Sequence, residues 1–132
     1  MDLAYIIEAA SAASAKAYAP YSNFRVGAAI LTKSGALYTG CNVENASYGL
    51  AICAERNAAA RMVVGATNAD DRKIRLVAVA SPDSAPCFPC GACRQVLREF
   101  GCEEVVVLDA SNELKRYPFQ ALLPHAFGPE DL

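Results

Sequence analysis

The sequence has no excess of basic residues and no long apolar run. Its 132 residues carry 12 Lys and Arg against 14 Asp and Glu, for a formal net charge of -2. Such a chain offers no basic footprint for a phosphate backbone, so we expect a free small molecule rather than a nucleic acid polymer as substrate. Runs such as Val105–Leu108 are far too short to cross a bilayer, so we expect no membrane partner.

The first residues also lack the features of a signal peptide. Asp2 stands where a basic region would be expected, and Glu8 interrupts the apolar stretch from Leu3 to Ala15, whose spacing is that of an amphipathic helix. Six cysteines in a small chain can form a disulfide framework, but that interpretation is strongest for secreted proteins. We therefore expect reduced cysteines and a cytoplasmic protein.

The chain does have enough apolar material for a core. Hydrophobic residues make up 54% of it and charged residues 20%, which argues against disorder and leaves apolar surface for contacts between subunits. No repeat or low-complexity segment interrupts it. A chain of this length fits one domain by size, so we expect a single domain over residues 1–132.

The order of the apolar patterns predicts a three-layered α/β fold. The expected elements are a helix at 3–17 capped by Asp2, a β-hairpin of strands 24–32 and 36–41, a helix starting near Cys53, a strand at 76–80, a helix starting near Cys90 and a strand at 105–108. They form a mixed sheet of about five strands with helices on both faces. Right-handed crossovers would bring both cysteine-bearing helix starts to one edge of that sheet.

Two short stretches carry the chemistry that a metal site needs, Cys53-Ala54-Glu55-Arg56 and Pro89-Cys90-Gly91-Ala92-Cys93. Three thiolates leave the fourth tetrahedral position of a zinc ion open for water, which separates a hydrolytic site from a closed structural one. Glu55 is then free for proton transfer. Placement at helix N-termini favours thiolate over thiol, and thiolate is the form that binds metal. Spacing alone leaves open whether Cys87 or Cys93 pairs with Cys90.

Motifs along almost the whole chain resemble those of the cytidine deaminases. They are Tyr21-Ser22-Asn23-Phe24-Arg25-Val26-Gly27-Ala28, Asn42-Val43-Glu44-Asn45, Cys90-Gly91-Ala92-Cys93-Arg94-Gln95, the Cys-x-Glu of residues 53–55 and the ending Phe127-Gly128-Pro129-Glu130-Asp131-Leu132. Three cysteines and a short chain resemble the small, homotetrameric branch of that family. The resemblance implies one zinc per subunit and hydrolytic deamination of cytidine and 2′-deoxycytidine, with sites near subunit interfaces.

The resemblance also assigns the metal and catalytic residues. The family pattern has proline directly before the first ligand of the pair, so Pro89 selects Cys90 and Cys93 beside Cys53 and leaves Cys87 as a bystander. Glu55 is expected to shuttle protons between water, ring N3 and the leaving amino group. His125, the only histidine, lies far from every motif, and we place it outside the site.

Three thiolates carry more negative charge than suits a zinc that must ionise its water. In proteins of the three-cysteine type an arginine at this motif position donates hydrogen bonds to ligand sulfurs, so the resemblance gives that role to Arg56. Arg94 is the alternative.

Further positions are implied to bind substrate. Asn42 and Glu44 would recognise ribose hydroxyls, Phe24 would pack against the pyrimidine, and backbone at Ala54 and at Pro89–Cys90 would contact the reacting groups. Phe127 resembles an aromatic that reaches a neighbouring subunit's site. The plainer interpretations are a turn cap for Asn42, a surface charge for Glu44, a core residue for Phe24 and a tail anchor for Phe127.

Two rival functions share the metal motifs. A deaminase of a cytosine-bearing antibiotic nucleoside has the same core, although the Asn42 and Glu44 pair argues against it. A noncatalytic zinc module would use the metal only to hold the fold.

Overall fold

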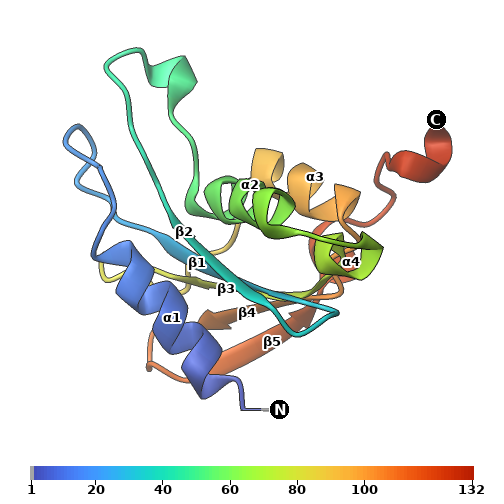
Figure 1. The fold of residues 1–132 in the computed structure, drawn as a ribbon. Helices are drawn as coiled ribbons and strands as arrows, with labels where there is room; N and C mark the ends of the chain where they lie inside the picture. Colours follow the sequence, from blue (N-terminus) through green and yellow to red (C-terminus); the bar gives the residue numbers. More distant parts are fainter. Residues whose placement is uncertain (1) are drawn as a thin grey trace.

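A computed structural model describes residues 2–132 as a five-stranded sheet with four α-helices (Figure 1). In chain order the elements are α1 (Ala4–Ser14), β1 (Gly27–Thr32), β2 (Leu37–Cys41), α2 (Ala54–Gly65), β3 (Ile74–Ala80), α3 (Gly91–Glu99), β4 (Glu104–Leu108), β5 (Leu114–Pro118) and α4 (Phe119–Leu122). None of the helices in this described part is long and apolar enough to cross a membrane.

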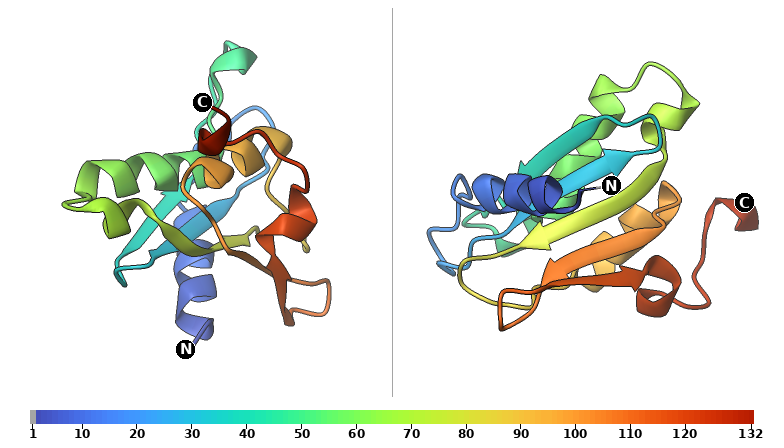
Figure 2. Two further views of the ribbon diagram at one scale, coloured as in Figure 1. Left: turned by 90° about the vertical axis from the view of Figure 1, so that its right-hand side faces the viewer. Right: turned by 90° about the horizontal axis from the view of Figure 1, so that it is seen from below.

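The strands lie in the order β2-β1-β3-β4-β5, and the sheet is mixed. β1 runs antiparallel to both of its neighbours, β3 and β4 are parallel, and β5 returns antiparallel to β4. Helix α1 covers one face, whereas α2 and α3 cover the other (Figures 1 and 2). This arrangement confirms the predicted α/β fold with helices on both faces.

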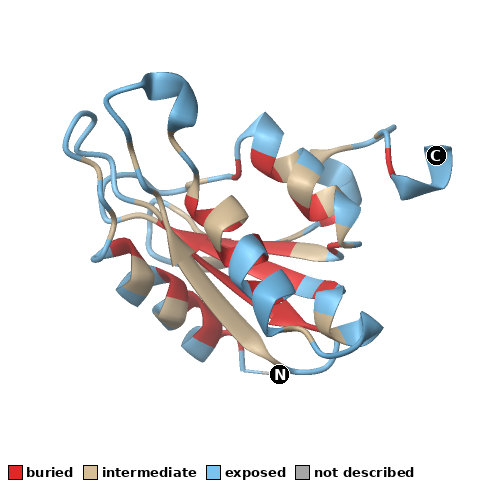
Figure 3. Cartoon of the chain, turned by 45° about the horizontal axis from the view of Figure 1, so that its top comes forward, coloured by how far each residue is buried: buried red, intermediate tan, exposed pale blue. Residues whose placement is uncertain are grey.

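The core lies on both faces of the sheet, and every residue of the inner strand β1 is buried (Figure 3). Because side chains alternate along a strand, Ala28 and Ile30 pack under α2 and α3, while Ala29 and Leu31 pack under α1. The sheet therefore has an apolar layer on each face, and the cysteine-bearing helices rest on a rigid support.

Two glycines let the helices lie close to the sheet. A Cβ at Gly27 would lie 1.8 Å from the carbonyl oxygen of Ala10 in α1. A Cβ at Gly40 would lie 2.6 Å from the carbonyl oxygen of Ala54, the first residue of α2. Only glycine permits such approaches, and the second one fixes the start of α2 against β2.

The structure shortens two predicted elements. Helix α1 ends at Ser14 rather than at residue 17, because the amide of Tyr18 donates to the carbonyl of Asn42 at 3.0 Å. β1 begins at Gly27 rather than at residue 24, because the Asn42 side chain bonds the backbone of Phe24 and Val26. The predicted cap at Asp2 is present as a bond from the Ala4 amide at 2.9 Å, although Leu3 is the residue adjoining the helix.

Candidate active site

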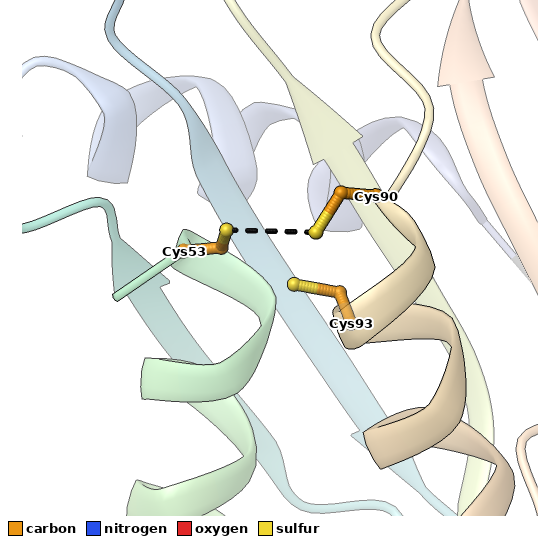
Figure 4. A group of neighbouring side chains, drawn as sticks. All are labelled: Cys53, Cys90 and Cys93. Atoms are coloured by element: carbon orange, nitrogen blue, oxygen red, sulfur yellow. Dashed lines mark hydrogen bonds between the residues drawn. The ribbon is translucent and has the colours of Figure 1, made fainter. Parts of the chain in front are cut away.

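Three cysteine sulfurs meet between the starts of α2 and α3. The Sγ atoms of Cys53, Cys90 and Cys93 all lie within 4.8 Å of one another, and those of Cys53 and Cys90 are 3.7 Å apart (Figure 4). Cys53 is the residue that caps α2 and Cys90 the residue that caps α3. The predicted convergence of the two helix starts is therefore confirmed.

The electrostatics of this cluster favour ionisation of Cys53. A hydrogen bond from Cys93 lowers the pKa of Cys53 to about 5, and bonds from Arg56 and Cys90 add to that effect against the cost of burial. The same bond to Cys53, together with burial, raises the pKa of Cys93, so Cys53 is the first of this pair to ionise. The unpaired N–H groups at each helix start supply further positive potential.

The residues present fit a zinc ion. Zinc–sulfur bonds of about 2.3 Å at tetrahedral angles imply a sulfur-to-sulfur separation of roughly 3.8 Å, close to the 3.7 Å between Cys53 and Cys90. Thiolate sulfur is a donor that zinc prefers. With three protein ligands, the fourth coordination position remains free for a small molecule.

Glu55 lies two residues after the first of these cysteines and is 3% exposed. Burial raises the pKa of its carboxyl to about 7, and the charge of Cys53 acts in the same direction. Its own backbone amide, Cys93 and Arg56 oppose the shift. A carboxyl that exchanges its proton near neutral pH, beside cysteines that can bind a metal ion, is suited to general acid and base catalysis.

Arg56 and Arg94 have different partners. Nη2 of Arg56 lies 3.5 Å from Cys53 Sγ, within the distance for a hydrogen bond to sulfur. Arg94 instead donates to the carbonyls of Pro89 and Leu122, each at 2.7 Å. The structure thus brings Arg56 to the sulfur of Cys53, while Arg94 ties the loop before Cys90 to the last residue of α4.

Asn42 and Glu44 hold the backbone of the loop at Tyr21–Val26. Asn42 accepts from the Val26 amide and donates to the Phe24 carbonyl, both at 2.8 Å. Glu44 accepts from the amides of Tyr21 at 3.0 Å and Ser22 at 3.2 Å and from the Ser22 hydroxyl. Phe24 itself is 39% exposed, so the loop presents an aromatic ring to solvent rather than to the core.

Residues 1–109 match the family described as "Cytidine and deoxycytidylate deaminase zinc-binding region". The chain is 40% identical to a cytidine deaminase of Sporosarcina psychrophila, over 100% of this chain and 96% of that protein. It belongs to the cytidine deaminase family. Zinc is the metal that this family's matched region binds, and the Cys53, Cys90 and Cys93 cluster is where this chain can hold it.

Solved structures of cytidine deaminases agree with the fold. That of the Burkholderia pseudomallei protein superposes with a TM-score of 0.83 at 46% identity, covering 96% of this chain and 100% of that one. The Mycobacterium tuberculosis protein gives a TM-score of 0.82 at 38% identity, with coverage of 97% and 98%.

The other cysteines lie outside the cluster. Cys87, three residues before Cys90, packs against the core beneath α2 and α3, and burial raises the pKa of its thiol to about 11. Cys102 is buried and donates to the Glu104 carbonyl, and Cys41 lies at the end of β2. All six cysteines are among the described residues, and none of them is in a disulfide.

Phe127 and Ala54 occupy very different positions in this deaminase-family chain. Ala54 is fully buried as the first residue of α2. Phe127 is 60% exposed, and its carbonyl accepts from Gln95 Nε2 at 2.9 Å. Figures 1 and 2 show its C-terminal segment projecting from the body of the subunit. His125 lies on this segment too and lines a cavity with Cys102 that includes none of Cys53, Cys90 and Cys93.

Sequence reasoning assigned no role to two contacts of the Tyr21–Val26 loop. Ser22 bonds Glu44, and Arg25 forms a two-pronged ion pair with Asp83 at 3.1 Å and 3.0 Å. Both Ser22 and Arg25 belong to the motif that carries the family resemblance. Their place in that motif was the sequence signal that could have pointed to a role for them. Their partners lie 22 and 58 residues away, and no local pattern indicates such contacts.

Proposed function

We propose that this chain catalyses the hydrolytic deamination of cytidine and 2′-deoxycytidine to uridine and 2′-deoxyuridine, with release of ammonia. The observation that carries the proposal is the cluster of Cys53, Cys90 and Cys93 beside the buried carboxyl of Glu55. By its substrate and product the reaction would belong to pyrimidine nucleoside salvage. The whole activity would reside in one domain over residues 1–132.

A zinc ion held by Cys53, Cys90 and Cys93 would supply Lewis-acid activation of water near neutral pH. Glu55 takes a proton from the attacking water and delivers it to ring N3. It then takes the second proton of that water from the hydroxyl added at C4 and supplies it to the amino group, which leaves C4 as ammonia. A carboxyl with a pKa of about 7 can both accept and donate at neutral pH, which each of these steps needs.

Substrate binding falls to the loop and strand-end residues. Phe24 packs against the pyrimidine, and Glu44 and Asn42 bind sugar hydroxyls. Each Asn42 amide atom uses one of its two hydrogen-bonding positions on the loop, so one donor and one acceptor position stay free. Backbone groups at Ala54 and Cys90 contact the reacting end of the base, and Arg56 offsets the charge of the thiolates.

We also infer a homotetramer with sites near the subunit interfaces, each subunit holding one zinc. Large apolar side chains are exposed on the projecting segment between β2 and α2 and on the C-terminal tail, among them Tyr48 at 76% and Phe127 at 60% (Figure 1). Phe127 would complete the site of a neighbouring subunit. Sedimentation analysis tests this, because a fully active monomer would exclude that role.

A nucleoside absorbance assay tests the function itself. Zinc-loaded protein is expected to convert both cytidine and 2′-deoxycytidine to their uracil products. Conversion of a cytosine-bearing antibiotic alone would support the first rival function, and conversion of none of the three would support a noncatalytic zinc module. Either result overturns the proposal.

A further inference from the structure

Ser22 stands at the junction of two parts of the proposed substrate site. Its hydroxyl donates to Oε2 of Glu44 and accepts from the Phe24 amide at 3.0 Å. One side chain thus joins the carboxylate proposed to bind the sugar to the backbone that carries the aromatic ring proposed to contact the base. The residues that line the adjacent cavity of about 310 Å³ are Tyr21, Ser22, Glu44, Asn45, Tyr48 and Ala51.

The acceptor positions of Glu44 are almost fully used. Oε1 accepts from the Tyr21 and Ser22 amides, which occupies both of its lone pairs, and Oε2 accepts from the Ser22 hydroxyl. One lone pair on Oε2 remains. A carboxylate in this state can accept one hydroxyl group without losing a bond to the protein.

We propose that Ser22 is a positioning residue, which fixes the Glu44 carboxylate so that its one free lone pair faces a single hydroxyl of the nucleoside sugar. The inference rests on the proposed function. Glu44 lies on the segment after β2, where a glutamate without the Ser22 bond could rotate its Oε2 away from the cavity. The bond from Ser22 also holds the pKa of the Glu44 carboxyl below its usual value, which keeps the group in its hydrogen-bond-accepting carboxylate form at lower pH.

Ser22→Ala removes the hydroxyl and leaves the two backbone bonds to Glu44 in place. A hydrogen bond to a charged group contributes enough that its loss is expected to raise KM for cytidine about tenfold, with kcat changed less than about twofold. Ser22→Thr keeps a hydroxyl and is expected to restore KM. Ser11→Ala, on the exposed face of α1, is the matched control and is expected to leave both constants unchanged.

Two further measurements separate positioning from a general loosening of the loop. In a Glu44→Ala background, adding Ser22→Ala is expected to change KM less than about twofold, because the two residues act as one unit. With Ser22→Ala alone, KM is expected to rise for cytidine and for only one of 2′-deoxycytidine and 3′-deoxycytidine. The other lacks the hydroxyl that Glu44 binds, so its KM should not change. This second comparison needs no variant of Glu44.

The outcomes distinguish the inference from the function beneath it. Wild-type protein that converts no cytosine nucleoside overturns both. Active wild-type protein whose Ser22→Ala variant raises KM equally for all three nucleosides overturns only the role of Ser22. Additive effects of Ser22→Ala and Glu44→Ala do the same.

Discussion

The guanidinium of Arg56 lies one turn along α2 from the thiolate that begins that helix, with Nη2 3.5 Å from Cys53 Sγ. Its Nε is buried and meets no hydrogen-bond partner within residues 2–132. The hydrogen bond to Cys53 is the main effect that raises the pKa of this guanidinium, and the charges of Cys53 and Cys93 act in the same direction. This half-buried cation, with one donor unused, contacts a sulfur of the cluster rather than a surface carboxylate.

Replacing Arg56 should therefore weaken catalysis more than folding. Loss of a group that supports a metal ligand typically costs about 10- to 100-fold in activity or metal affinity. We expect a decrease of that size in kcat for Arg56→Ala, with a smaller decrease for Arg56→Lys, which keeps the charge but loses the planar fork. Steady-state kinetics at a fixed zinc content measure both.

Arg61 provides the control on the same helix, because it donates to the Thr39 carbonyl at 2.9 Å and lies at the surface. Arg61→Ala should leave kcat unchanged. Equal losses in the Arg61 and Arg56 variants would mean that Arg56 acts through helix stability alone.

Glu55→Gln should abolish most turnover while the metal stays bound. The amide has nearly the same shape but can neither take nor return a proton, and general acid and base catalysis contributes about 10²- to 10⁴-fold. We expect kcat to fall by at least that factor, with zinc content and melting temperature close to those of the wild type. Glu8→Gln on the exposed side of α1 is the matched control. Substantial turnover by the Glu55 variant would remove this residue as the proton carrier.

Much of the fold follows from local pattern, and the exceptions have clear causes. Strand β1 was predictable because its apolar residues serve cores on both faces and Gly35, at a φ of 93°, allows the turn to β2. Strand β5 was not located, because its outward residues are charged and little apolar alternation remains. It is held as an edge strand by pairing with β4 and by the Arg116–Glu104 ion pair, and neither interaction is visible in sequence order.

The cluster of Cys53, Cys90 and Cys93 was predictable for a related reason. Its ligands lie in two short motifs at helix starts, so only one long-range step, the meeting of the two helices, had to be inferred. The loop contacts need several such steps. In the sequence, the hairpin of β1 and β2 separates Ser22 from Glu44, and β3 also separates Arg25 from Asp83. These partners therefore meet only in the completed fold.

Cys87 and Cys90 should respond differently to the same substitution. Both begin a Cys-x-x-Cys pattern, but only Cys90 lies in the sulfur cluster, while Cys87 packs against the core. Cys90→Ser should lose most bound zinc and nearly all turnover, because a hydroxyl is a poor ligand for zinc. Cys87→Ser should keep both within about twofold, at a small cost in stability from burying a hydroxyl. Metal analysis of the two purified variants shows which Cys-x-x-Cys pair binds zinc. Zinc loss from the Cys87 variant would contradict the assignment of Cys90 and Cys93.

Removing the zinc should end turnover without unfolding the chain. Helices α2 and α3 are anchored by buried apolar side chains, including Ala58, Met62 and Leu97, and the sheet has a second core beneath α1. These contacts do not need the metal. We expect chelator-treated protein to keep its far-ultraviolet circular dichroism at room temperature, and zinc to restore its activity. Its melting temperature should fall, because the folded cluster binds zinc and the unfolded chain lacks the assembled site.

The same treatment separates an enzyme from a zinc module that only holds a fold. In a module of that kind the metal supplies the folding free energy, so chelation would abolish the helical signal together with the melting transition. Here the apolar layers on both faces of β1 should preserve that signal, and the activity alone should follow zinc occupancy. Titrating zinc back into the apoprotein gives the sharpest comparison. Turnover should rise in proportion to bound metal and saturate at one ion per chain, while the circular dichroism stays constant throughout.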